Sequence, residues 1–124
     1  MLLNATIISF NADIEEEIIV KINDVELTCF IGYCPIKISR GESYPVELSF
    51  FVIDSLDVKA QLDDEKITEL VKLENARYLL KGFLSSDGIL NVGFNIKDEL
   101  LEDYQFLFGE YVELEIDRMT IDFG

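Results

Sequence analysis

The sequence predicts a mainly β fold with one or two short helices, arranged as a small, partly open β-barrel. Apolar residues alternate with polar ones over several short segments, which is typical of strands with one buried face. The segment 111–123 changes the phase of this alternation part-way, which indicates a bent strand. Bent strands allow a sheet to curl into a barrel, and a β-sandwich is the alternative architecture.

A single domain covering residues 1–124 is predicted from the length and the composition. Hydrophobic residues make up 49% of the chain, which is enough to bury a core without disulfides. The positive mean hydropathy of +0.21 argues against intrinsic disorder, although the charge is high.

Three strand regions are expected in the first half of the chain, over residues 3–11, 18–33 and 46–54. Asn23-Asp24 interrupts the second region, where we expect a turn or a bulge. Residues 34–44 contain proline, glycine and serine and are expected to form a loop. The region 46–54 becomes apolar on both parities, so we expect a central strand that ends buried on both faces.

One helix is expected after the acidic run 63–65, which offers an N-cap and a negatively charged first turn. Ile67, Leu70 and Val71 follow at helical spacing, and the helix should end before the strand alternation of residues 78–84 begins.

A hairpin is predicted at Asp87-Gly88, between a strand over 78–84 and a strand over 89–94, because glycine tolerates the positive φ of a tight turn. Residues 96–103 form either a short helix or a structured loop, since two adjacent leucines do not fix a period.

The last strand, 111–123, is expected to hold a β-bulge near Asp117-Arg118, where the apolar parity changes. An extra residue at that point keeps both halves facing one core. The apolar residues concerned are Val112, Leu114 and Ile116 before the change, and Met119, Ile121 and Phe123 after it.

The order of these elements resembles that of an OB-fold, a five-stranded Greek-key barrel with a helix between its third and fourth strands. The resemblance covers nearly the whole chain and leaves residues 96–109 as an extra segment. An OB-like barrel implies single-stranded nucleic acid as a ligand, which needs aromatic side chains beside a basic groove. The basic residues are scattered along this chain, so we expect the aromatic residues to fill the core instead.

The net charge is −15, from ten basic and 25 acidic residues. Such a field repels nucleic-acid phosphates and anionic membrane surfaces, so neither partner is expected. A basic protein partner fits the charge, although acidic surfaces also serve simply to keep proteins in solution. The chain has no signal-peptide pattern and no apolar run near the ~20 residues that cross a bilayer, so a soluble protein is expected.

Catalysis, cofactor binding and metal binding find little support in the residue types. The chain has no histidine, the commonest general base and a common zinc ligand, and its glycines form no phosphate-binding pattern. Cys29 and Cys34 are expected to be free thiols in the cytoplasm, a reducing compartment. We predict a non-enzymatic protein without a cofactor or a metal. The acidic cluster at Asp98, Glu99, Glu102 and Asp103 lacks the spacing of a calcium loop.

Glu113, Glu115 and Asp117 are the candidate partner-binding residues, because they alternate with apolar residues and should form an outward row spaced ~6.6 Å apart. A solvated strand face is the other explanation of this row. The favoured function is a non-enzymatic acidic module that docks a basic protein partner, as immunity and inhibitor proteins do. The alternative is a small-ligand or divalent-metal-dependent β-barrel protein with its site near the loop 34–44. Self-association through an exposed strand edge is a third hypothesis.

Overall fold

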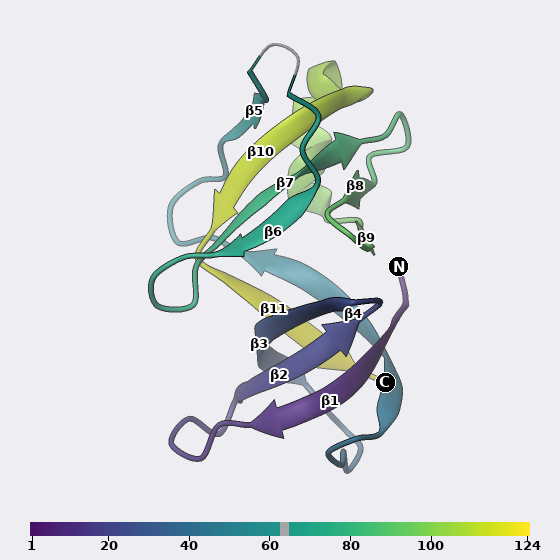
Figure 1. Cartoon of the computed structure of the whole chain (residues 1–124), viewed down its shortest axis with the longest axis vertical. Coiled ribbons are helices and arrows are strands. Elements are labelled where there is room, and N and C mark those ends of the chain that lie inside the picture. The colour runs from purple at the N-terminus through teal and green to yellow at the C-terminus, as the bar shows by residue number, and fades with distance from the viewer. Residues whose placement is uncertain (63–64) are drawn as a thin grey trace.

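The computed structural model describes residues 1–62 and 65–124, which form two β-sheets and one short 3-10 helix. Figure 1 shows one sheet curled into a ring at one end of the long axis and a smaller sheet at the other end. All strand pairs are antiparallel except one, between β3 and β11. The structure thus confirms the predicted mainly β fold.

Five strands make the ring, and each pairs with two neighbours. Their order around the ring is β1 (Leu3–Phe10), β2 (Glu17–Ile22), β3 (Val25–Tyr33), β11 (Arg118–Phe123) and β4 (Ser43–Phe51), which returns to β1. The predicted turn between β2 and β3 lies at Asn23-Asp24, where Asn23 adopts a φ of 54°. Asparagine tolerates this left-handed conformation better than most residues, so it suits a two-residue turn.

The ring is partly open beside the second half of β4. Residues 43–46 of this strand pair with β1, whereas residues 46–51 pair with β11. The β1 side of residues 47–51 therefore has no strand neighbour in the described part of the chain. Main-chain groups left unpaired in this way need other partners.

The second sheet is built around β7 (Tyr78–Leu84), which pairs along one edge with β10 (Glu110–Ile116). Its other edge is shared by two short strands, β6 (Glu69–Lys72) and β8 (Leu90–Asn91). Gly82 permits the close approach of β8, because a Cβ at this position would collide with the carbonyl oxygen of Asn91. The sheet is completed by β5 (Val58–Ala60), β9 (Asn95–Ile96) and the adjoining 3-10 helix η1 (Glu99–Leu107).

The change of apolar parity in residues 111–123 has a different cause from the predicted bulge. The chain leaves the second sheet at the end of β10 and enters the ring as β11, with Asp117 as the one residue between them (Figure 1). Each half therefore faces the core from a different sheet, and the change of parity coincides with the passage between them. All six apolar residues are buried, as predicted: Val112, Leu114, Ile116, Met119, Ile121 and Phe123.

The predicted helix after residues 63–65 is wrong for the described part of the segment, which contains the strand β6. The side chain of Gln61 explains the difference, because its oxygen accepts the Ile67 N–H at 3.0 Å and its NH₂ donates to the Ile67 carbonyl at 2.9 Å. This amide acts as a strand neighbour and captures main-chain groups that a helix would use. The proposed N-cap at Asp63-Asp64 lies outside the described residues.

Two further strand predictions need correction. The strand predicted over 46–54 ends at Phe51, and both Phe51 and Ile53 are exposed, at 40% and 72%. The chain turns away from the ring there, so this end is not buried on both faces. The strand predicted over 89–94 is confined to β8, because the chain folds back at Gly93, which has a φ of 112°, to form β9.

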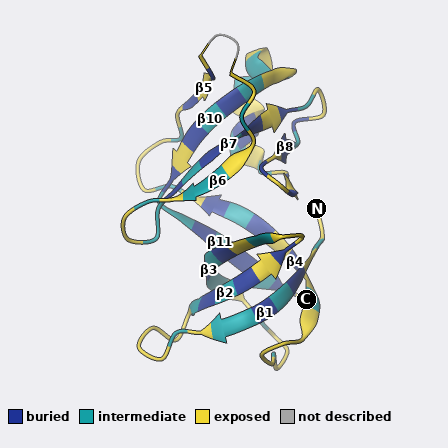
Figure 2. Cartoon of the chain, viewed as in Figure 1, coloured by how far each residue is buried: buried dark blue, intermediate teal, exposed yellow. Residues whose placement is uncertain are grey.

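The buried side chains of both sheets form one continuous core. Figure 2 shows that buried residues alternate along the strands, whereas exposed residues gather in the loops. Residues 96–103, whose structure the sequence left open, end β9 and begin η1, with Leu101 fully buried. In the described part of the chain, no helix is long and apolar enough to cross a membrane.

Candidate functional site

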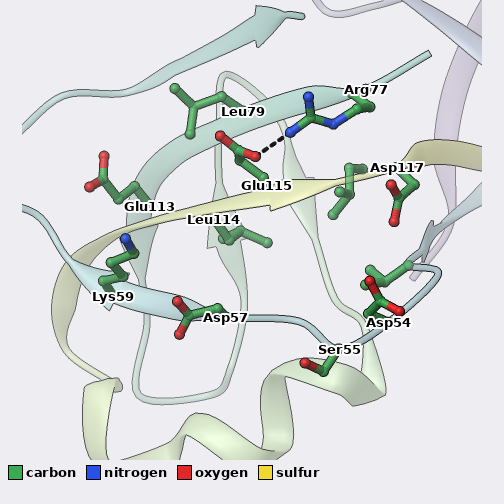
Figure 3. A pocket seen from close by; sticks show the side chains of 12 residues that line it. Asp54, Ser55, Asp57, Lys59, Arg77, Leu79, Glu113, Leu114, Glu115 and Asp117 are labelled. Carbon is green, nitrogen blue, oxygen red and sulfur yellow. Dashed lines mark hydrogen bonds and ion pairs between the residues drawn. The ribbon is translucent and has the colours of Figure 1, made fainter. Parts of the chain in front are cut away.

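A pocket of about 480 Å³ opens at the edge of the second sheet, between β10 and residues 52–57 (Figure 3). The chain between β4 and β5 is tied at both ends of this opening. At one, β5 pairs with Val112–Leu114. At the other, the Asp117 N–H donates to the Phe51 carbonyl at 3.0 Å, and the Asp117 carboxylate accepts the Ile53 N–H at 2.7 Å. The segment bows away between these two ties.

The pocket has apolar residues in its lining and a ring of charged side chains. Val52, Leu79, Leu114 and Ile116 supply the apolar part. The charged part contains more acidic than basic groups, so the pocket carries uncompensated negative charge. These charged residues are the five carboxylates of Asp54, Asp57, Glu113, Glu115 and Asp117, and the two basic side chains of Lys59 and Arg77.

The three residues predicted from the sequence all line this pocket. Glu113 and Glu115 lie on the outward face of β10, half-buried and exposed respectively, as the alternation predicts. Asp117 does not continue their row, because it lies between the two sheets and its carboxylate is bound to the Ile53 N–H. It holds the pocket open at one end, and this structural role could not be read from the spacing.

Basic side chains of the same sheet already accompany the two glutamates. Arg77 forms an ion pair with Glu115, and the ammonium group of Lys81 lies 3.7 Å from a carboxylate oxygen of Glu113. Figure 3 shows the Arg77 guanidinium against the Glu115 carboxylate at the rim. The Arg77 and Glu115 side chains are 40% and 55% exposed. Surface pairs of this kind contribute about 0–1 kcal/mol, so they can exchange with an incoming cation.

Asp54 and Asp57 are the acidic residues that the sequence reasoning missed. Both are exposed, and neither carboxylate forms a hydrogen bond or an ion pair with any residue in the described ranges 1–62 and 65–124. The sequence carried one usable signal, the close spacing of two aspartates after an apolar strand. Asp54 and Asp57 line the same pocket as Glu115 because β10, more than fifty residues later in the chain, folds beside them.

The chain was compared with models of known protein families over its whole length. A model of the family described as uncharacterised conserved protein UCP019853 matches residues 1–124. The chain belongs to this family. Comparisons with curated proteins and with solved structures gave no match.

In this member of the UCP019853 family, Asp98, the first residue of the acidic cluster at residues 98–103, has a structural role. One carboxylate oxygen of Asp98 accepts the Leu100 N–H at 2.9 Å and caps η1, and the other accepts the Phe50 N–H of β4 at 2.7 Å. Asp98 therefore joins the helix to the open side of the ring. Within the described residues, no group of three or more His, Cys, Asp or Glu side chains is placed to hold a metal ion.

Both cysteines of this family member are unpaired, as predicted. Cys29 is fully buried, and burial raises the pKa of its thiol far above the ordinary value. Cys34 is half-buried, and its thiol donates a hydrogen bond to the Ile36 carbonyl at 3.2 Å. The loop 34–44, where the alternative function placed its site, is further ordered by the Tyr44 hydroxyl, which accepts the Ser39 N–H at 2.8 Å.

Proposed function

We propose that this protein is a non-enzymatic acidic interaction module that receives a basic side chain of a protein partner in the pocket between β10 and residues 52–57. The observation that carries the proposal is the pair Asp54 and Asp57, whose exposed carboxylates form no ion pair or hydrogen bond with a described residue and line a pocket that also has apolar residues. Lysine and arginine have long apolar stems and charged ends, so they fit such a site.

The methylene stem and the cationic end of the partner's basic side chain would contact different parts of the pocket. The methylene stem would lie against Val52 and Leu79, the partly exposed apolar residues of the lining, and the cationic end would meet the aspartates and Glu115. Arginine is the better match because its planar fork can bind two carboxylates at once. Arg77 occupies Glu115 in the free protein, and its weak, exposed pair would exchange when the partner binds.

The net charge of the whole chain also favours a basic protein partner. A net charge of −15 attracts a basic protein surface over a distance and raises its association rate, by about 10-fold to 1,000-fold in electrostatically steered complexes. Immunity and inhibitor proteins use this form of complementarity, and the analogy is one of class alone. The competing explanation is that these carboxylates merely hydrate the surface.

The experiment compares three forms of the protein that differ in where charge is removed. The test variant is Asp54→Asn with Asp57→Asn, and the matched control is Glu15→Gln with Glu16→Gln, which removes two charges from the exposed loop between β1 and β2. Each form is immobilised and exposed to native lysate at low salt, and captured proteins are identified. In parallel, the peptide acetyl-Gly-Arg-Gly-amide is titrated into each labelled protein while the amide signals of residues 52–57 are followed by NMR.

The proposal requires one basic protein that the wild type and the control capture and the test variant does not. It also requires peptide shifts at residues 52–57 that weaken in the test variant and at raised salt. Equal capture by all three forms, or no basic protein captured by the wild type, would overturn it.

A small organic ligand in the same pocket is the second candidate. A volume of about 480 Å³ lies within the ~300–1,000 Å³ typical of ligand sites. Thermal-shift screens of amines, with Ca²⁺ and Mg²⁺ as further arms, separate this candidate from protein docking, because a bound ligand raises the melting temperature without a partner.

The remaining sequence predictions stay proposals. They are the cytoplasmic location, which the two free thiols support, the absence of nucleic-acid and membrane partners, which the charge supports, and self-association through a strand edge. The OB-like strand order is also retained as a proposal, supported by a ring of five strands.

A further inference from the structure

Arg118 lies outside the pocket, on the outer face of the ring, between two aromatic rings. It is the first residue of β11 and pairs with Phe51 of β4. Its guanidinium carbon lies 4.3 Å from the centroid of the Phe51 ring and 4.7 Å from that of the Phe30 ring in β3. Cation–π contacts with both rings fix the guanidinium in position.

The Arg118 side chain forms no hydrogen bond or ion pair with a side chain or main-chain group of the described residues. Its Nε atom is buried and has no hydrogen-bond partner among the described residues. No described carboxylate lies within ion-pair distance of its guanidinium, although the chain has 25 acidic residues. The adjacent Asp117 binds the Ile53 N–H instead. Buried donors are nearly always paired in folded proteins, so an unpaired one calls for an explanation.

A carboxylate ligand supplies that explanation. The two rings hold the guanidinium through cation–π contacts. The N–H donors of a guanidinium lie in its plane, where they match the two oxygens of a carboxylate. The Phe51 ring is 40% exposed, and Ile53, two residues further on, is 72% exposed. These side chains give the ligand an apolar surface beside the charge.

We propose that Arg118, Phe30 and Phe51 form a receptor for a carboxylate that is attached to an apolar group. The ligand is a monoanion, because the net charge of −15 disfavours groups with more negative charge. Because the Nε atom is buried, its contact with the ligand requires the side chains that cover it to shift. The site is separate from the proposed docking of a basic side chain, and neither depends on the other.

A purely structural role is the competing explanation, in which Arg118 only joins β3, β11 and β4 across the outer face of the ring. The two explanations differ in what a free carboxylate does. A structural arginine gains nothing from one, whereas a receptor binds it in a saturable way.

Benzoate is the probe, titrated into the ¹⁵N-labelled protein while the arginine Nε–H signals are followed by NMR. The chain has three arginines, so the Arg118 signal can be assigned with an Arg118→Lys variant, and Arg40 and Arg77 serve as internal controls. Benzamide is the neutral control of the same shape, and sodium chloride at equal ionic strength controls for screening.

The expected result is a saturable shift of the Arg118 signal with benzoate, little change at Arg40, and no comparable effect of benzamide or chloride. Arg118→Lys keeps the charge but lacks the planar fork, so benzoate affinity should fall by about tenfold or more, as read from the amide signals of Phe30 and Phe51. An Arg118 signal that does not respond to benzoate well above millimolar concentration, or responds equally to chloride, would overturn the proposal. This outcome is read on the wild type, and the Arg118→Lys variant is needed only to assign the signal.

Discussion

The hydroxyl of Tyr78 in β7 accepts a hydrogen bond from the main-chain N–H of Thr28 in β3, at 2.7 Å. Thr28 lies just before the part of β3 that pairs with β11, which begins at Cys29. The second sheet therefore supplies the partner that the ring lacks at this point. Asp98 does the same for the Phe50 N–H on the open side of the ring. These two bonds join the sheets through groups that would otherwise be unpaired.

Replacing Tyr78 by phenylalanine should lower the free energy of unfolding by about 1–3 kcal/mol, because the Thr28 N–H then loses its acceptor in a partly buried place. Urea unfolding measures the difference. Tyr33→Phe is the matched control, since Tyr33 is 61% exposed, and its effect should be close to zero. Equal effects of the two substitutions would contradict the assigned role of Tyr78.

Tyr78 should also make stability depend on alkaline pH. Burial raises the pKa of its phenol, and the hydrogen bond from Thr28 opposes this shift in part. The folded state then holds the proton more tightly than the unfolded state. This contribution is complete below the unfolded pKa of about 10 and is lost as pH rises through it toward the folded pKa. Urea midpoints between pH 8 and pH 11 should fall less steeply in Tyr78→Phe than in wild type, and parallel curves would contradict the prediction.

Asp98 is half-buried and should be among the loop positions most sensitive to substitution, because its one carboxylate accepts hydrogen bonds from two main-chain donors. Hydrogen bonds to charged groups are worth about 1.5–3 kcal/mol each, and we expect Asp98→Ala to cost about 2–4 kcal/mol in total. Hydrogen exchange at the Phe50 amide should accelerate most. Asp103→Ala, in the exposed part of η1, is the control and should leave that amide unchanged. Unaltered exchange at Phe50 in Asp98→Ala would show that this contact is dispensable.

The two thiols should differ in reactivity. Cys29 is fully buried with a raised pKa, whereas Cys34 is half-buried beside a loop. Only the thiolate reacts, and only where a reagent can reach it. The native protein should therefore react with a disulfide reagent at Cys34 alone, and at both positions in denaturant. Mass spectrometry after labelling identifies the site, and native modification of Cys29 would indicate that the ring opens readily.

The strands that alternate in the sequence were predictable, because their pattern is a direct consequence of one buried face. The alternation from Val25 to Ile31 gives β3, and the predicted parity change near Asp117-Arg118 coincides with the passage between the sheets, although it was interpreted as a bulge. Which sheet each half joins could not be predicted, since parity records burial and not the neighbour. The absence of a helix before β6 also depends on Gln61, whose side-chain contact with Ile67 has no local signal in the sequence.

The candidate site was predictable only along β10. Glu113 and Glu115 follow from alternation within one strand. Asp54, Asp57 and Arg77 reach the same pocket from other elements, and such proximity depends on strand order. The sequence shows the excess of acidic residues, but the structure is needed to tell paired carboxylates from unpaired ones.

Arg77 should limit how strongly the pocket binds a cation, because its guanidinium occupies the Glu115 carboxylate in the free protein. Arg77→Gln should change the unfolding free energy by less than about 1 kcal/mol, since both side chains are exposed. It should nevertheless bind acetyl-Gly-Arg-Gly-amide more tightly than wild type does, with larger NMR shifts at residues 52–57. Lys37→Gln removes the same charge from a distant loop and controls for net charge, so only a gain specific to Arg77→Gln counts. Equal gains in the two variants would mean that the peptide senses the overall field and that Glu115 takes no direct part.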